Sequence, residues 1–158
     1  SNVLEPTGIA IDTTAGRLYW CDLGTQMVHR AMLDGSGVED VVTNLSHPQG
    51  IAIDSLNGKI YWSDSGTFLI QRANLDGSAV ENVISKGVKD PYGVAVDEAD
   101  GRLYWSSVGT IYERKGGPSS PKTSGKIQRS RLDGSSVEDV VLGFGRTKPV
   151  SLAIGIAR

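Results

Sequence analysis

The segment PTGIAIDTTAGRLYWCD, residues 6–22, sets the pattern of this chain. It returns as PQGIAIDSLNGKIYWSD at 48–64 and as PYGVAVDEADGRLYWSS at 91–107. Each copy holds an apolar run, a polar turn that ends in glycine, and a second run centred on Tyr-Trp. Runs rich in isoleucine, valine and aromatic residues on both sides of a turn predict two antiparallel strands. Three in-phase copies predict a repeat protein.

Two further extended segments complete each unit. One ends in LDGS, and the last reads VEDVV (38–42), VENVI (80–84) or VEDVV (137–141). No segment carries the apolar spacing of a helix, which excludes the helical TPR and ankyrin repeats. Four short strands per roughly 42 residues are typical of a β-propeller blade. The sequence therefore predicts an all-β propeller.

The proline that opens each unit divides the single predicted domain, 1–158. The repeats are 6–47, 48–90 and 91–148, followed by a partial fourth at 149–158. The third repeat is about 16 residues longer than the others, which predicts an inserted loop.

The quartets YWCD (19–22), YWSD (61–64) and YWSS (104–107) carry a family resemblance. With GIAID before them and LDGS after them, they resemble the YWTD repeats of the low-density lipoprotein receptor family, also called class B repeats. The third copy departs from the pattern, with Ser107 in place of the earlier aspartates. The resemblance implies a closed ring of six four-stranded blades, of which this chain supplies three plus an extra strand.

Most residues that recur in every unit are predicted to be structural, since a feature present once per blade serves what every blade needs. The inner-strand aspartates are expected to bind turn amides, and the Tyr-Trp pairs to fill the space between blades. A ring of aspartates on a metal, or aromatic pairs stacked on a ligand, is the competing hypothesis. The residues are Asp12, Asp54, Asp97, Tyr19, Tyr61, Tyr104, Trp20, Trp62 and Trp105.

The positions that do not recur indicate where function lies. Between proline and glycine the crossover residue changes in every unit, and so do the residues before the proline. These side chains are expected to rim the channel mouth, because loops on a rigid scaffold often carry binding sites. An ordinary solvated loop is the alternative. The candidate residues are Thr7, His47, Gln49, Asp90, Tyr92 and Lys148, with Tyr112 and Arg114 from the insertion.

The insertion TIYERKGGPSSPKTSGK, 110–126, is rich in glycine, proline and serine and is predicted to be a loop. It connects the second and third strands of its unit, so it is expected on the same face as the crossovers. A plain surface excursion and a loop that contacts a partner both fit.

Three blades leave two apolar end faces uncovered, each of several hundred Å² and more than a monomer usually exposes as one patch. We expect either a homodimer that closes a six-bladed ring, or a chain that is half of a longer polypeptide, cut from it or separately encoded, with a second half-propeller that supplies the rest. The segment 149–156 resembles a further innermost strand and would compete for the place of residues 8–12. A fragment or engineered half-propeller is a third reading, which the irregular insertion argues against.

Composition narrows the function classes. A net charge of −2 with 22% charged residues argues against nucleic-acid binding, and no apolar run is long enough to span a bilayer. One cysteine, Cys21, and two separated histidines, His29 and His47, exclude a Cys/His zinc cluster, so no cofactor or metal is predicted.

No G-x-S-x-G, H-E-x-x-H or phosphate-loop motif occurs, and no catalytic residue is assigned. The favoured function is a non-enzymatic binding module. An enzyme of hydrolase, lyase or cyclase type with an axial pocket is the alternative. The resemblance implies an extracellular or secreted protein, with the cytoplasm as the alternative, and the lack of Cys-rich modules favours a stand-alone protein over a receptor. Asn44-Leu45-Ser46 fits a glycosylation acceptor.

Overall fold

The computed structural model describes residues 3–108, 125–143 and 152. In these ranges the chain forms three four-stranded antiparallel sheets, each a simple meander. This confirms the prediction of an all-β fold built from propeller blades. Blade 1 is β1 (Pro6–Asp12), β2 (Arg17–Asp22), β3 (Met27–Met32) and β4 (Glu39–Val42). Blade 2 is β5 (Pro48–Asp54), β6 (Lys59–Asp64), β7 (Leu69–Asn74) and β8 (Glu81–Ile84). Blade 3 is β9 (Pro91–Asp97), β10 (Arg102–Ser107), β11 (Lys126–Arg131) and β12 (Glu138–Leu142).

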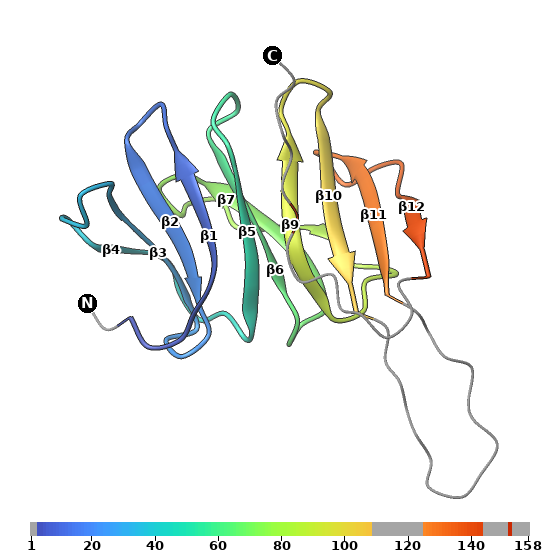
Figure 1. Cartoon of the computed structure of the whole chain (residues 1–158), viewed down its shortest axis with the longest axis horizontal. Helices are drawn as coiled ribbons and strands as arrows, with labels where there is room; N and C mark the ends of the chain where they lie inside the picture. Colours follow the sequence, from blue (N-terminus) through green and yellow to red (C-terminus); the bar gives the residue numbers. More distant parts are fainter. Residues whose placement is uncertain (1–2, 109–124, 144–151, 153–158) are drawn as a thin grey trace, which may run out of the picture.

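The blades fan out from their first strands. Strands β1, β5 and β9 are neighbours, while β4 and β12 lie at opposite sides of the view in Figure 1. Each sheet therefore places its first strand at the hub and its last strand at the rim. This radial order puts the crossovers between blades next to one another at the hub.

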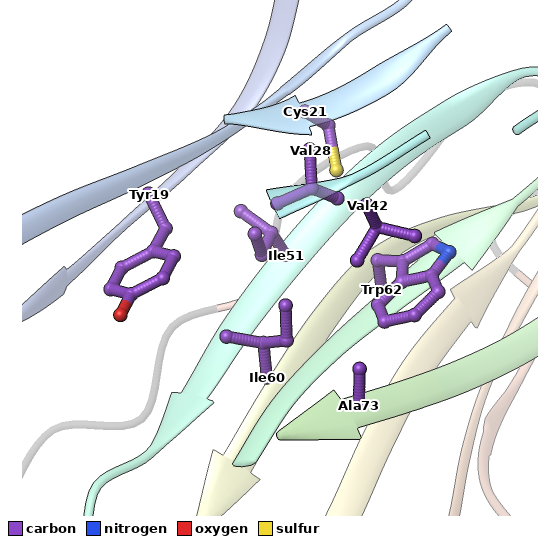
Figure 2. Packing of buried hydrophobic residues seen from close by; sticks show 8 residues of the cluster. All are labelled: Tyr19, Cys21, Val28, Val42, Ile51, Ile60, Trp62 and Ala73. Atoms are coloured by element: carbon purple, nitrogen blue, oxygen red, sulfur yellow. The ribbon is translucent and has the colours of Figure 1, made fainter. Parts of the chain in front are cut away.

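The core lies between the blades, not within them. Blade 1 and blade 2 enclose one apolar cluster, to which Tyr19 contributes from one side and Trp62 from the other. Figure 2 shows the side chains of this cluster converging from β2, β3 and β4 on one side and β5, β6 and β7 on the other. Blade 2 and blade 3 repeat the arrangement with Tyr61 and Trp105. In each Tyr-Trp pair the tyrosine thus faces the next blade and the tryptophan faces the preceding one.

For two of the six aromatic residues the interblade role stays a prediction. The sequence placed all three Tyr-Trp pairs between blades, but Trp20 and Tyr104 belong to neither interblade cluster. Trp20 lies on the outer face of blade 1 and stacks on His29, with 5.3 Å between ring centroids. Tyr104 lies on the outer face of blade 3 and is half-buried. A strand exposes successive side chains to opposite faces, so the two terminal blades each turn one aromatic outward.

Short turns join the first two strands of each blade, and an aspartate organises each of them. The carboxylate of Asp12 accepts hydrogen bonds from the backbone N–H groups of Thr14 and Ala15 at 3.0 and 3.1 Å. Asp54 accepts from Asn57, and Asp97 accepts from Ala99 and Asp100. These are the Asx-type turns in which aspartate replaces a backbone acceptor.

The structure corrects two boundaries predicted from the sequence, the end of the third strand and the end of the insertion. Two other predicted segments lie mostly outside the described residues. LDGS forms the turn after β3, β7 and β11 and is not part of those strands, because its aspartate binds the serine N–H two residues on. The insertion ends before Lys126, which already belongs to β11. Residues 109–124 lie outside the described residues, and so does the extra strand 149–156 apart from Leu152, which is not in a strand.

Candidate functional site

Glycines bring the three hub strands into close contact. A Cβ added to Gly50 would lie 2.2 Å from the carbonyl oxygen of Tyr92, and one added to Gly8 would lie 2.4 Å from that of Gln49. Any side chain at these positions would push neighbouring strands apart, so only glycine fits. The hub backbone is therefore a fixed platform for the side chains that flank the glycines.

The hub opens into a concavity of about 400 Å³. Three of the predicted channel-mouth residues, Thr7, Gln49 and Tyr92, line it together, one from each blade. The sequence did not anticipate Leu152, which lines the concavity from the C-terminal segment. The remaining lining residues are Gly8, Ile9, Gly50, Ile51, Gly93 and Val94. The concavity is thus an apolar hollow with a polar side chain from each crossover at its edge.

The three crossover side chains are not equally available. The Thr7 hydroxyl donates to the carbonyl of Pro48 at 3.0 Å, which ties blade 1 to blade 2. The Gln49 amide makes only a long contact of 3.5 Å with the Ser65 hydroxyl. Gln49 and Tyr92 are both half-buried. Gln49 and Tyr92 are therefore the better placed of the three to bind a ligand.

Buried aspartate carboxylates hold the crossovers in place by accepting hydrogen bonds from their backbone N–H groups. Asp64, at the end of β6, accepts hydrogen bonds of 2.8 and 3.1 Å from the backbone N–H groups of Ser46 and His47. It also accepts two of 3.0 Å from Gly66 and Thr67 in the β6–β7 loop. These contacts show that crossovers and β6–β7-type loops share one face, here called the crossover face. They also rule out a catalytic reading of Asp64, because its oxygens are occupied.

In blade 1 the carboxylate of Asp22 holds the equivalent backbone segments, and its ionisation makes the stability of the fold depend on pH. Burial opposes ionisation of Asp22, but the N–H groups of Thr25, Leu4 and Glu5 donate to the carboxylate and hold its pKa below the ordinary value. Because the pKa is lower in the folded chain, the stabilisation is complete above the unfolded value of about 3.8 and is lost as pH falls through the folded value.

We therefore expect Asp22→Asn to lower the free energy of unfolding at pH 7 and to flatten its fall in acid. Urea unfolding of both chains from pH 7 down to about pH 2.5 measures this, since that range begins above the unfolded pKa and extends below it. The two stability curves should approach each other as the pH drops. Curves that stay parallel through the acid range would show that folding does not lower the pKa of Asp22.

Blade 3 lacks this anchor. Ser107 occupies the equivalent position, and its buried hydroxyl finds no hydrogen-bond partner among the residues that the structure describes. One backbone bond, from Val108 N–H to the carbonyl of Asp90 at 3.1 Å, still holds the crossover, as its equivalents do in the other blades. The blade that carries the insertion is thus also the blade whose crossover is held least firmly.

Several predicted site residues do not join the concavity. His47 is exposed and its Nδ1 lies 3.1 Å from the Ser46 hydroxyl, while Asp90 is half-buried, and neither lines the hollow. Lys148, Tyr112 and Arg114 lie outside the described residues.

Phe68 is a feature of the crossover face that sequence reasoning missed. It lies in the β6–β7 loop, is 50% exposed and has a φ of 58°. A bulky side chain in the left-handed region is strained, and an exposed phenylalanine loses the benefit of burial. The signal in the sequence was the position after Gly-Thr, which holds Gln26 in blade 1 and Phe68 in blade 2.

The remaining chemistry is mainly structural. Burial, with the charges of Asp64 and Asp22, raises the pKa of the Cys21 thiol, so it stays protonated. His29 is buried between Thr25 and Asp40, which contact its two ring nitrogens at 2.8 Å. Among the described residues, no three His, Cys, Asp or Glu side chains gather as a metal site. None of the described residues forms a helix that could cross a membrane.

The blades, their hub and their interblade clusters define a β-propeller of the YWTD class, and comparison with known families agrees. The low-density lipoprotein receptor repeat class B matches residues 16–55 and 58–98, just over half of the chain. The chain belongs to this family. No curated protein sequence gives a significant match.

Several solved structures are similar to this chain in fold. A chain from the crystal structure of a nidogen/laminin complex is 26% identical, with a TM-score of 0.76 over 88% of this chain and 49% of its own. A gluconolactonase from Xanthomonas campestris (19% identity, TM-score 0.69) and a streptogramin B lyase (15%, 0.67) share the fold. They align with 89% and 92% of this chain, and with 48% and 43% of their own chains. The chain therefore spans about half the length of these structures.

Proposed function

We propose that this chain is a non-enzymatic module that binds a partner protein with its crossover face. The observation that carries this proposal is Phe68, an exposed aromatic side chain held at a positive φ on the face where Gln49 and Tyr92 also lie. Aromatic side chains dominate the energy of protein interfaces, and the same turn in blade 1 holds Gln26 at a φ of 60°, so the exposed aromatic side chain and not the backbone conformation is particular to blade 2. The similar chain in the nidogen/laminin structure belongs to a protein complex, which supports a partner of protein type.

The platform under these residues suits recognition. Crowded glycines fix the hub, and Asp22 and Asp64 fix the crossovers, so binding would cost little ordering of the backbone. His47 and Asp90 flank the concavity on the same crossovers and, with Lys148 and the 110–126 loop, remain proposed contributors. Family membership supports an extracellular or secreted setting for such a module.

A small-molecule enzyme is the second candidate. The concavity of about 400 Å³ falls in the range of ligand pockets. Two solved structures of the same fold are enzymes, a gluconolactonase and a streptogramin B lyase. Tyr92 is, however, the one acid–base side chain among the described lining residues, and histidine, the side chain used most often for such catalysis, is not among them. The lining therefore favours binding over catalysis.

The variant Phe68→Asn tests the proposal through two opposite effects. Asparagine tolerates a positive φ, so we expect the free energy of unfolding to rise by about 1 kcal/mol. Loss of the aromatic contact should weaken partner binding at least about tenfold. Binding is measured by surface plasmon resonance against a panel of purified matrix and cell-surface proteins, laminin included, and stability by urea unfolding.

Leu56→Ala provides the matched control, because Leu56 is 73% exposed but lies in a turn at the other end of blade 2. It should change neither binding nor stability. A chain that binds no protein of the panel but hydrolyses gluconolactone, with the activity lost in Tyr92→Phe, would contradict the proposal and support the enzyme. Self-association into a homodimer, or pairing with a second half-propeller, is a further part of the proposed behaviour and is measured by solution mass.

A further inference from the structure

The same polar contact joins each blade to the next. Arg30 Nη1 donates to the carbonyl of Leu75 at 3.0 Å, and Arg72 Nη1 donates to that of Leu132 at 2.9 Å. Each arginine also pairs with a glutamate of its own blade, Glu39 or Glu81, at 2.6 Å. The Tyr19 hydroxyl also donates to the carbonyl of Leu75, and the Tyr61 hydroxyl to that of Leu132, each at 3.4 Å. The donor side of the contact is always the earlier blade.

The second part of each interface is a glycine of the later blade, which leaves a notch for the backbone of the earlier blade. A Cβ on Gly77 would lie 1.9 Å from the carbonyl oxygen of Val41, and one on Gly134 would lie 2.2 Å from that of Val83. The glycine of LDGS therefore receives the outermost strand of the preceding blade. Each blade thus has a donor face and a notched acceptor face.

Blade 3 ends the described blades with a donor face that has no acceptor. Arg129 keeps its pair with Glu138 at 2.6 Å, but no hydrogen bond from it to a later blade is found in the described part of the chain. Its side chain is 37% exposed, against 21% for Arg30 and 22% for Arg72. Beside it Val141 is 41% exposed, whereas Ile84, its equivalent in blade 2, is 3% exposed.

Blade 1 has an acceptor face, the counterpart of the donor face of blade 3. Gly35, the equivalent of Gly77, has open space where its neighbour would be, since no residue that the structure describes lies within 4 Å of an added Cβ. Ile9 and Ile11 are 66% and 54% exposed, whereas Ile51, which corresponds to Ile9, is 6% exposed against blade 1. The acceptor face is therefore built but uncovered.

We propose that the donor face of blade 3 docks on the acceptor face of blade 1 of a second copy of this chain, head to tail and twice. Arg129 and Tyr104 would donate to the carbonyl of Leu33 in the other copy, and Gly35 there would receive the β12 backbone at Val140. This inference rests on the self-association proposed above and adds to it which faces meet, in which polarity and through which residues. It requires the C-terminal segment at Leu152 to leave free the place that residues 8–12 of the other copy take at the hub.

A second copy is the occupant that the two faces specify. They match each other residue by residue through two contacts already present inside the chain, whereas an unrelated partner would have to imitate both. Two identical chains related by a two-fold axis bury both end faces and close the assembly. Closure also completes the hub, because each copy supplies Gln49 and Tyr92 to one side of the channel.

Gly35→Asn tests the interface, with Gly77→Asn as its matched control. Asparagine accepts the positive φ of 83° at Gly35 and enters open space, so the single chain should keep its fold and melting temperature. In the dimer it would meet the incoming backbone of β12. The same change at Gly77 should destabilise the chain itself, because Val41 already occupies that space.

Sedimentation velocity over a micromolar concentration series gives the mass. We expect twice 16.8 kDa for the unsubstituted chain, and a dimer dissociation constant raised at least about tenfold by Gly35→Asn, which introduces a clash, and by Arg129→Ala, which removes a contact. An unsubstituted chain that stays monomeric would overturn both self-association and this interface. A dimer that both variants leave unchanged would overturn the interface alone, because self-association would then use another surface.

Discussion

Trp62→Ala should cost about 3–5 kcal/mol of unfolding free energy, the range for loss of a buried aromatic side chain. Trp62 is fully buried between blade 1 and blade 2, in one cluster with Tyr19, Val28 and Val42 (Figure 2). Its Nε1 donates to the Gln71 side chain at 3.2 Å. Truncation would leave a cavity between two sheets whose other packed side chains are fixed by their own strands, so relaxation of the site can recover little of the loss.

Urea unfolding followed by tryptophan fluorescence measures this effect, and Trp20→Ala is the internal control. Trp20 holds the same repeat position, but its outer face meets no blade among the described residues. Its truncation should cost less than that of Trp62, because Trp20 packs on His29 of its own blade and not between two sheets. Equal losses at the two positions would indicate that burial within one blade, and not packing between blades, accounts for the effect, and a loss well under about 1 kcal/mol at Trp62 would contradict its interblade role.

Asp64→Asn should cost about 3 kcal/mol, because charged acceptors of backbone N–H groups contribute more than neutral ones. The variant keeps the size of the side chain but removes its charge and turns one oxygen into a donor that faces N–H groups. Four backbone donors, from Ser46 to Thr67, depend on this one buried carboxylate. The crossover should loosen, so partner binding at the crossover face should weaken together with stability.

Asp76→Asn is the control for this change. Asp76 is exposed and accepts only from Ser78, through its N–H and its hydroxyl, so its loss should stay below about 1 kcal/mol. Chemical unfolding at pH 7 gives both values. Similar losses at Asp64 and Asp76 would show that the buried carboxylate does not anchor the crossover.

The candidate site was predictable only where the repeat pattern broke. Thr7, Gln49 and Tyr92 were found as the varying residues between an invariant proline and glycine, and the structure brings them to one concavity. Phe68 escaped notice because nothing in a sequence reports a positive φ for a phenylalanine. Leu152 escaped because its approach to the hub depends on the path of a segment with no repeat partner.

The sequence by itself determined the blade: its four strands, their turns and the alternation of apolar residues follow from local propensity and from a period that three copies repeat. Tertiary structure decided what each copy of a repeated residue does. Trp62 packs between two blades whereas Trp20 is buried against His29 of its own blade, and Gly77 is crowded while Gly35 is open, although each pair holds the same repeat position. The reason is physical, since burial and hydrogen bonding depend on which blade stands alongside, and a residue's local sequence does not specify its neighbour in space.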